Sequence, residues 1–198
     1  LVNELAILCD RMNISLWEVV DAAKTKPYGF QPFYPGPGLG GHCIPLDPYY
    51  LTWKAREYGF HTSMIETSMM INDKMPEYCV DRAAKVLNRR KKALNGSKVL
   101  VLGVAYKADI DDYRESPAID VIEILQREGA DVDFFDPYIS KFRAHGKEYV
   151  GIADINPEIV AGYDLIFVAA AHTNVDYDMI EQNSQVIFDS KNAMKDVK

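Results

Sequence analysis

One cysteine lies in a segment that is unusually rich in glycine and proline. The segment, FYPGPGLGGHCIPLDPYY, contains Cys43 and, four residues later, Asp47. A helix is expected to begin at Pro48, and the positive end of a helix dipole favours the thiolate form of a nearby thiol. A thiolate is a nucleophile, and a carboxylate four residues on would exchange a proton or orient a water beside it. This spacing allows covalent chemistry at the cysteine.

Each of these residues also has a purely structural interpretation. Cys43 fits a small packed side chain, as many unpaired cysteines are. Asp47 fits the N-cap of the helix that follows it. His42 adjoins the cysteine, but the side chains of adjacent residues usually point apart, so we do not expect a Cys–His pair. The local pattern alone leaves both interpretations of Cys43 and Asp47 open.

The loop before the cysteine is expected to be shaped for a ligand. Its glycines at 36, 38, 40 and 41 let backbone amides approach a bound molecule and permit positive φ angles. Its prolines at 35, 37 and 45 limit its flexibility. Residues 26–45 carry no helix or strand pattern, and about twenty such residues in a compact domain usually have a function.

The residues before 93 carry helical patterns. The first helix, over residues 1–14, has an apolar face that we expect to be buried, made of Leu1, Leu5, Leu8, Cys9 and Met12. Ser15 is expected to cap the next helix, and Asp47-Pro48 to start another. A longer helical tract, residues 63–92, is expected to kink or restart at Pro76.

After Asn95-Gly96 the pattern changes to alternating strands and helices. The runs KVLVLGVAY, DVDFFDP, YDLIFVAAA and QVIFD predict strands, and SPAIDVIEILQREGA predicts an amphipathic helix. Strand–helix–strand alternation implies a parallel sheet. We therefore predict an α/β protein, with a helical domain over residues 1–93 and a parallel α/β domain over residues 97–198.

The first predicted strand leads into a loop that lacks the dinucleotide fingerprint. Its sequence, VLGVAYKADIDD, has one glycine where the fingerprint needs three. Without those glycines the backbone cannot approach a pyrophosphate, so we expect another ligand here, such as a mononucleotide. Lys107 and Arg114 would meet its phosphates. The alternative is that both are solvated loop charges.

Composition narrows the classes of partner. The 198 residues include 22 basic and 29 acidic side chains, a net charge of −7, which argues against nucleic acid or an anionic membrane as the main partner. Cys9, Cys43 and Cys79 form neither a metal-binding spacing nor a disulfide framework, so we expect reduced thiols in the cytoplasm. No apolar run approaches the roughly 20 residues that span a membrane. The chain opens at Leu1 inside a helical pattern, and we interpret it as a piece of a longer protein.

Three motifs, in this order, resemble the UDP-glucose/GDP-mannose dehydrogenases: PGPGLGGHCIPLDP, VLGVAYKADIDDYRESPA and DFFDP. The resemblance covers nearly the whole chain. It implies a central helical domain through which family members pair as homodimers, followed by a Rossmann-like domain that binds the nucleotide sugar. His42 and Leu46 resemble the branch that oxidises UDP-N-acetylhexosamines. The N-terminal NAD-binding domain of the family, with its catalytic Lys and Asn, would precede Leu1.

The resemblance implies a four-electron oxidation at the sugar C6, which converts an alcohol to a carboxylate and uses two NAD⁺ in turn, for surface polysaccharide precursors. Cys43 matches the nucleophile that forms a thiohemiacetal and then a thioester. Asp47 matches an acidic residue that assists proton transfer or the hydrolytic water, and Arg114 matches a position that reaches the cofactor. Lys191 stands where the family has Arg. A lysine keeps the positive charge but lacks the planar guanidinium that makes paired hydrogen bonds. The expected substrate contacts are Tyr34, Pro35, Gly36, Pro37, Gly38, Leu39, Gly40, Gly41, His42, Tyr106, Lys107 and Lys191.

Two other functions compete with this hypothesis. The broad apolar faces of residues 63–92 favour a non-catalytic module that binds a nucleotide sugar or dimerises, and that is inactive without its N-terminal domain. A cysteine hydrolase that uses Cys43 and His42 is a weaker alternative. The sequence leaves the epimer of the N-acetylhexosamine open.

Overall fold

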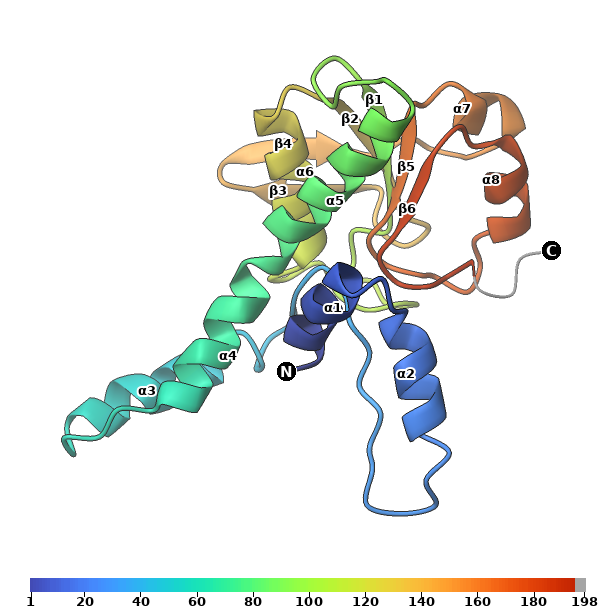
Figure 1. The fold of residues 1–198 in the computed structure, drawn as a ribbon. Coiled ribbons are helices and arrows are strands. Elements are labelled where there is room, and N and C mark those ends of the chain that lie inside the picture. Colours follow the sequence, from blue (N-terminus) through green and yellow to red (C-terminus); the bar gives the residue numbers. More distant parts are fainter. Residues whose placement is uncertain (195–198) are drawn as a thin grey trace.

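The computed structural model describes residues 1–194, in which helices α1–α4 lie to one side of a three-layer α/β unit (Figure 1). None of the helices in this range combines the length and the apolarity needed to cross a membrane. In chain order the elements are α1 (Val2–Arg11), α2 (Leu16–Ala23), α3 (Asp47–Arg56), α4 (Ser63–Asp73), α5 (Met75–Arg89), β1 (Lys98–Leu102), α6 (Pro117–Arg127), β2 (Asp131–Phe135), β3 (Lys141–Ala144), β4 (Lys147–Val150), α7 (Pro157–Ala161), β5 (Leu165–Val168), α8 (Tyr177–Asn183) and β6 (Ile187–Asp189).

A four-stranded sheet forms the centre of the α/β unit. Its strand order is β2-β1-β5-β6, and every neighbouring pair is parallel, so the predicted parallel sheet is confirmed. Val101 of β1 lies between Phe134 of β2 and Phe167 of β5. The carboxyl ends of these strands therefore meet at one edge, where ligands of open α/β sheets bind.

Helices cover both faces of this sheet. Val99 and Val101 of β1 belong to a cluster that includes residues of α5 and α6. Leu100 and Leu102 belong to a second cluster, which includes Ile180 of α8. The four β1 residues are almost fully buried, which explains why the strand is a continuous apolar run rather than an alternating one.

Helix α5 packs with the sheet. It contacts α6, and its residues Cys79, Val80 and Leu87 are buried in the cluster of the first face. The chain then turns at Gly96, whose φ is +80° and whose amide donates to the carbonyl of Gly129. The division of the chain between residues 93 and 97 stays a prediction.

The three predicted helix starts are confirmed, and α3 begins at Asp47 with Pro48 in its first turn, but the predicted N-cap of α3 is wrong. The hydroxyl of Ser15 accepts a hydrogen bond from the amide of Glu18 (3.4 Å), as an N-cap does. Pro76 lies at the start of α5, and a break at Lys74 separates this helix from α4. Asp47 is not an N-cap, because it lies inside α3 and Leu46 precedes it without a side-chain cap.

The apolar face of α1 is exposed, contrary to the prediction. Leu1, Leu5, Leu8 and Met12 are exposed and Cys9 is half-buried, whereas Asn3 is the buried residue of this helix. Periodicity identifies which face of a helix is apolar but not which surface covers it. Helices α3 and α4 extend away from the sheet and also expose large apolar side chains, among them Trp53 and Met64 (Figure 1).

Several short elements were not predicted. Strands β3 and β4 form an antiparallel hairpin, in which Phe142 stacks on Tyr149 with ring centroids 4.7 Å apart. Its two-residue turn, His145 and Gly146, has positive φ at both positions. Histidine is an unusual first residue for such a turn, which Asn-Gly or Asp-Gly normally signals. Helices α7 and α8 are similarly short.

Candidate functional site

The predicted nucleophile lies in the turn that leads into α3. Its thiol is exposed, so the packing interpretation of Cys43 is wrong. The carbonyl of Cys43 accepts hydrogen bonds from the amides of Leu46 (3.1 Å) and Asp47 (2.8 Å), so these residues already form a helical turn. Asp47 thus follows Cys43 by one turn, and residues at that spacing share a face of the helix. No hydrogen bond or ion pair within residues 1–194 engages the Asp47 carboxylate.

The side chains of His42 and Cys43 face each other, which the sequence did not predict. The Nδ1 atom of His42 is 3.5 Å from the Cys43 Sγ atom, and the direction of this hydrogen bond depends on the tautomer of the histidine. Adjacent side chains point apart in an extended strand, but residues 41–43 form a bend. The bend places imidazole and thiol on the same side of the chain.

The glycines before His42 lie directly on the segment that follows β1. A Cβ atom added at Gly40 would be 2.5 Å from the Tyr106 Cβ atom and 2.6 Å from the Glu115 carbonyl oxygen. One added at Gly41, where φ is +94°, would be 2.9 Å from the Tyr106 ring. The amide of Gly41 also donates to the carbonyl of Arg114 (3.0 Å). These positions need glycine because two backbones meet there.

The other end of the loop contacts two separate parts of the chain. The amide of Gly36 donates to the Asn3 Oδ1 atom (3.0 Å), and the Asn3 side-chain amide donates to Asn72 (2.9 Å). A Cβ atom at Gly36 would lie 3.0 Å from the Lys191 Nζ atom, so this lysine lies beside the loop. Burial lowers the pKa of Lys191, while the negative charge of Asp189 opposes the shift.

The first residues of the loop are engaged in packing. The Tyr34 ring stacks on Trp17 of α2, with centroids 5.2 Å apart, and its hydroxyl accepts a hydrogen bond from Lys24 (3.4 Å). Residues 35–37 are buried. In the predicted contact segment 34–41, the exposed side chains are therefore those of Tyr34 and Leu39.

Lys107 and Arg114 follow β1, and they differ in their contacts within residues 1–194. The Arg114 guanidinium donates to both carboxylate oxygens of Asp112, with Nη2 2.7 Å from Oδ2, and these bonds lower the pKa of Asp112 to about 2. Asp112 was not among the predicted site residues, although the spacing D-x-R signals it. Lys107 is exposed, and no contact within the described part of the chain engages its amine. Lys107 is therefore free to meet a ligand.

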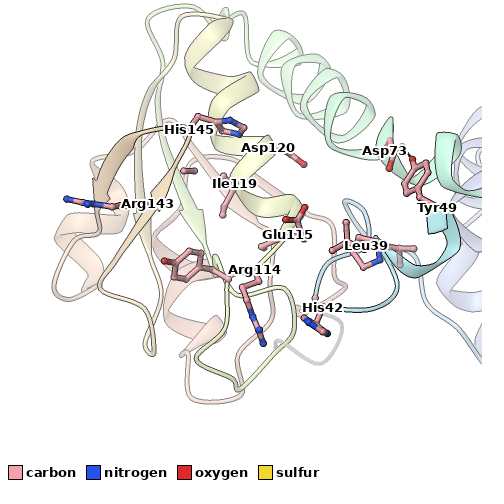
Figure 2. A pocket seen from close by; sticks show the side chains of 16 residues that line it. Leu39, His42, Tyr49, Asp73, Arg114, Glu115, Ile119, Asp120, Arg143 and His145 are labelled. Carbon is pink, nitrogen blue, oxygen red and sulfur yellow. Dashed lines mark hydrogen bonds between the residues drawn. The ribbon is translucent and has the colours of Figure 1, made fainter. Parts of the chain in front are cut away.

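A cavity of about 580 Å³ adjoins the cysteine loop (Figure 2). Leu39, Gly41, His42 and Arg114 of the predicted site line it, and Cys43 does not. The opposite wall comes from α6 and the β3–β4 hairpin and includes Asp120, Arg143 and His145. The volume suits a small molecule, and the lining mixes apolar side chains with charges of both signs.

The carboxyl end of β1 does not form a dinucleotide cradle. Its one glycine, Gly103, has a φ of +80°, and a Cβ atom there would be 2.5 Å from the carbonyl oxygen of Ala170. Gly103 is thus needed for a contact between neighbouring connections of the sheet. The residues at this edge do not fit the pyrophosphate of NAD⁺, which is consistent with the missing fingerprint.

Comparison with protein families gives two matches, which follow each other along the chain. The model of the UDP-glucose/GDP-mannose dehydrogenase family, central domain, matches residues 1–74. The model of the UDP binding domain of the same family matches residues 100–196.

Individual relatives match over the whole chain. The UDP-N-acetyl-D-glucosamine 6-dehydrogenase of Pseudomonas aeruginosa is 36% identical over 198 residues, which are 100% of this chain and 46% of that protein. The UDP-N-acetyl-D-mannosamine dehydrogenase of Methanocaldococcus jannaschii is 32% identical, over 98% of this chain and 43% of its own length. This chain thus spans a little under half the length of these relatives.

Solved structures share the fold as well. The UDP-D-ManNAc dehydrogenase of Pyrococcus horikoshii superposes with a TM-score of 0.83 at 30% identity, covering 98% of this chain and 44% of that one. A UDP-glucose dehydrogenase of Pyrobaculum islandicum gives a TM-score of 0.81 at 26% identity, covering 99% and 45%. Both domain models, the alignments over the whole of this chain and the superpositions show that this chain belongs to the UDP-glucose/GDP-mannose dehydrogenase family, as its motifs predict.

Proposed function

We propose that this chain supplies the nucleophilic thiol and the nucleotide-sugar site of a dehydrogenase that oxidises C6 of a UDP-N-acetylhexosamine to a carboxylate, for surface polysaccharide precursors. One observation carries the proposal: the loop that ends in Cys43 lies on the segment that carries Tyr106 and Lys107, with Gly41 bonded to Arg114. A nucleotide held at the sheet edge would direct its sugar toward the thiol. The names of the relatives support an N-acetylhexosamine as the sugar.

The chemistry needs a nucleophile because an aldehyde cannot readily lose a second hydride. The Cys43 thiolate adds to the aldehyde carbon, and the carbonyl oxygen takes the electron pair and a proton to give a thiohemiacetal. Loss of a hydride from this carbon, together with the proton of its hydroxyl group, yields a thioester. Water then attacks the thioester carbonyl and expels the thiolate, which leaves the carboxylate. His42, 3.5 Å from the sulfur, is placed to exchange the thiol proton, and Asp47 is one helical turn away for the water.

NAD⁺ would accept both hydrides. Because the β1 edge does not fit a dinucleotide, this cofactor would be held mainly by residues outside this chain, with Arg114 as the contribution from within it. Arg114 lines the cavity beside His42, and its Asp112 partner fixes its orientation. The three cysteines are free thiols, as is usual for proteins of the reducing cytoplasm, and this supports a cytoplasmic location.

The substrate contacts that we propose form two groups. Lys107 and Lys191 supply positive charge for the diphosphate, and the burial of Lys191 beside Gly36 would strengthen such an interaction. The loop from Tyr34 to His42 would contact the sugar and the ribose, mostly through backbone amides. A lysine at 191 cannot make the paired hydrogen bonds of an arginine, so we expect it to act as a point charge.

The test uses a fusion of this chain to the N-terminal part of the Pseudomonas aeruginosa relative. The fusion protein is incubated with NAD⁺ and with UDP-N-acetylglucosamine, UDP-N-acetylmannosamine or UDP-N-acetylgalactosamine. Mass spectrometry of the products should show the uronic acid of at least one sugar. Cys43→Ala should abolish the acid, whereas Cys9→Ala, which changes a half-buried thiol in α1, should not. Uronic acid made at the normal rate by Cys43→Ala would overturn the proposal.

A second candidate function is supported by the exposed apolar side chains of α3 and α4. Tyr50, Leu51, Trp53, Phe60 and Met64 lie on these helices or the turn between them. We propose that a second copy of the chain covers them in a homodimer, and that the isolated chain binds nucleotide sugar without turnover. Light scattering that shows a monomer at high concentration would contradict the dimer. Absence of heat on titration with millimolar UDP would contradict the binding site.

A further inference from the structure

A buried histidine–aspartate pair lies at the carboxyl edge of the sheet. Asp136 directly follows β2, and His172 lies in the connection after β5. The two residues are 6% and 1% exposed, and the His172 Nε2 atom is 3.0 Å from the Asp136 Oδ2 atom. Nothing in the proposed chemistry uses either side chain.

The hydrogen bonds of the pair define which nitrogen of His172 carries the proton. The Asp109 amide donates to the His172 Nδ1 atom (3.0 Å), so this nitrogen carries no proton and Nε2 donates to Asp136. The same Asp136 oxygen accepts from the amides of Val104 (2.7 Å) and Ala105 (3.1 Å). Burial alone would raise the pKa of Asp136, but these hydrogen bonds and that of the Tyr138 amide hold it below its ordinary value.

The pair thereby holds both ends of one short segment, residues 104–109. Asp136 fixes the start of the segment and His172 fixes its end. At that end Asp109 has a φ of +62°, an uncommon conformation for a residue with a side chain, and its carboxylate accepts from the Thr173 amide (2.8 Å). Between the two ends lie Tyr106 and Lys107.

A purely structural role for the pair would be to join the connections after β1, β2 and β5. The contacts of segment 104–109 indicate a role in the proposed site as well. Three of the amides bound by the pair belong to this segment, which carries proposed substrate contacts. Lys107 has no side-chain partner in residues 1–194, so its position depends on its backbone. The Tyr106 ring in turn meets Gly41, two residues before Cys43.

We propose that His172 is a positioning residue that acts through Asp136 and the Asp109 amide to hold Lys107 toward the nucleotide and Tyr106 against the cysteine loop. The inference rests on the proposed nucleotide-sugar site. It adds a link between the sheet edge and the cysteine loop through two buried side chains, His172 and Asp136.

Two substitutions separate the two hydrogen bonds of the imidazole. His172→Asn can keep an acceptor for the Asp109 amide while losing the donor to Asp136, and His172→Gln can keep the donor while losing that acceptor. We expect His172→Gln to speed amide hydrogen exchange in residues 106–109 and to weaken UDP binding about tenfold, the equivalent of one buried hydrogen bond. His172→Asn should have a smaller effect in both measurements, because the Asp109 amide keeps an acceptor and Asp136 still binds the amides of Val104 and Ala105.

A control removes a partly buried hydrogen bond elsewhere in the sheet unit. Tyr163→Phe deletes the hydroxyl that donates to Asp133 (2.8 Å), outside segment 104–109. It should lower the melting temperature by an amount similar to His172→Gln without changing UDP affinity or exchange in residues 106–109. Should His172→Gln fail to fold, hydrogen exchange of the unsubstituted chain still decides. The Asp109 amide, bonded to the His172 Nδ1 atom, should exchange more slowly than an unbonded amide, and exchange as fast as that of an unbonded amide would contradict the inference.

The outcomes are distinguishable. If His172→Gln melts lower but binds UDP and exchanges amides like the unsubstituted chain, His172 is structural only and the inference is wrong. If the unsubstituted chain does not bind UDP, the proposed nucleotide site is wrong. The exchange rates of residues 106–109 then still decide whether His172 holds this segment.

Discussion

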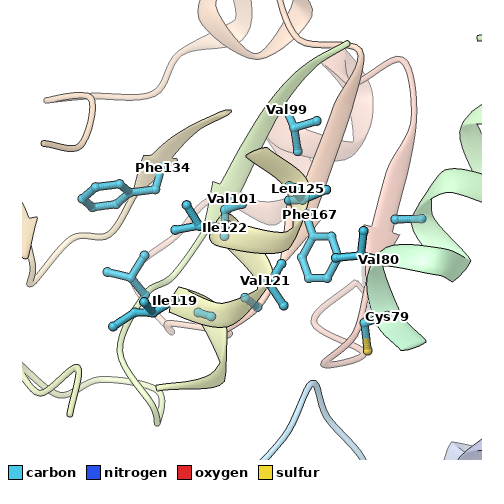
Figure 3. Packing of buried hydrophobic residues seen from close by; sticks show 14 of the residues in the cluster. Cys79, Val80, Val99, Val101, Ile119, Val121, Ile122, Leu125, Phe134 and Phe167 are labelled. Atoms are coloured by element: carbon cyan, nitrogen blue, oxygen red, sulfur yellow. The ribbon is translucent and has the colours of Figure 1, made fainter. Parts of the chain in front are cut away.

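The sheet unit and the helices α1–α4 are stabilised in different ways. In the sheet unit, side chains such as Val101, Leu125 and Phe167 are fully buried between the strands and helices α5 and α6 (Figure 3). The helices α1–α4 bury few apolar side chains, and Met64 and Trp53 are 85% and 63% exposed. The sheet unit therefore carries its own core, whereas the helices present apolar surface of the kind that a partner covers.

The cysteine loop connects these two regions. It starts after α2 and ends at α3, yet its middle lies on Tyr106 and Pro117 of the sheet unit. The proposed nucleotide site thus lies on the well-packed sheet unit, whereas the thiol lies next to helices that bury few apolar side chains. Changes in the two regions should accordingly have separable effects on stability and on reactivity.

The largest expected effect comes from truncating the sheet core. Phe167→Ala should lower the free energy of unfolding by about 3–5 kcal/mol, because it empties a fully buried site. Trp53→Ala should change it by less than about 0.5 kcal/mol, since that ring is exposed. Urea denaturation followed by circular dichroism measures both.

The tryptophans sharpen this comparison, because Trp17 and Trp53 both lie in α1–α4. Their fluorescence reports on that region alone, whereas circular dichroism reports on all helices. If Phe167→Ala moved the fluorescence transition as far as the dichroism transition, the two regions would unfold together and the contrast between them would be wrong.

The second effect concerns the thiols of the two regions. Cys43 is exposed, whereas burial of Cys79 in the sheet core raises the pKa of its thiol to about 12. Because the thiolate is the reactive form, iodoacetamide near neutral pH should alkylate Cys43 at least about 100-fold faster than Cys79. Peptide mass spectrometry over time gives both rates, with Cys79→Ala as the assignment control. Equal rates in the native chain would mean that the sheet core opens readily.

Much of the fold could be predicted from the sequence because its signals are local. The buried strands β1 and β5 are continuous apolar runs, and α6 begins at a Ser-Pro pair whose serine caps it. The hairpin β3–β4 was missed because its strands have four residues each and its turn is His-Gly. The exposure of Leu5 and Leu8 could not be predicted, since it depends on which surfaces meet α1.

For the site, motifs identified the residues but not all of their contacts. The glycine positions predicted a close approach of backbones, and Gly40 and Gly41 make one with Tyr106. The contact between His42 and Cys43 depends on a bend that no residue type announces. His172 and Asp136 lie 36 positions apart, yet each follows a strand of one parallel sheet. Polar residues in such positions meet at the carboxyl edge, and this signal could have found them.

Acid should affect the sheet unit through Asp136, with a smaller effect than core truncation. The pKa of this carboxyl lies below its ordinary value of 3.8 in the folded chain. Its contribution to stability is therefore fully present above the unfolded value and is lost as pH falls through the folded one. The dichroism melting temperature should fall below about pH 4.

The substitution Asp136→Asn isolates this contribution. It should lower the melting temperature at neutral pH and flatten its decline in acid, because the titrating group is gone. Glu18→Gln, an exposed change in α2, should leave both features unchanged. An acid decline that is equally steep with and without Asp136 would assign it to other carboxylates.

The smallest effects come from helix caps, and they test whether the regions are independent. Ser15 caps α2 next to Trp17, and Asn156 caps α7 on the sheet unit, with the Ile159 amide 2.9 Å from Asn156 Oδ1. Each change to Ala should cost about 1 kcal/mol. Ser15→Ala should move the fluorescence transition, and Asn156→Ala the later dichroism transition. Equal shifts in both signals would mean that the cysteine loop, bonded to the sheet unit at Gly41, makes the chain one cooperative unit.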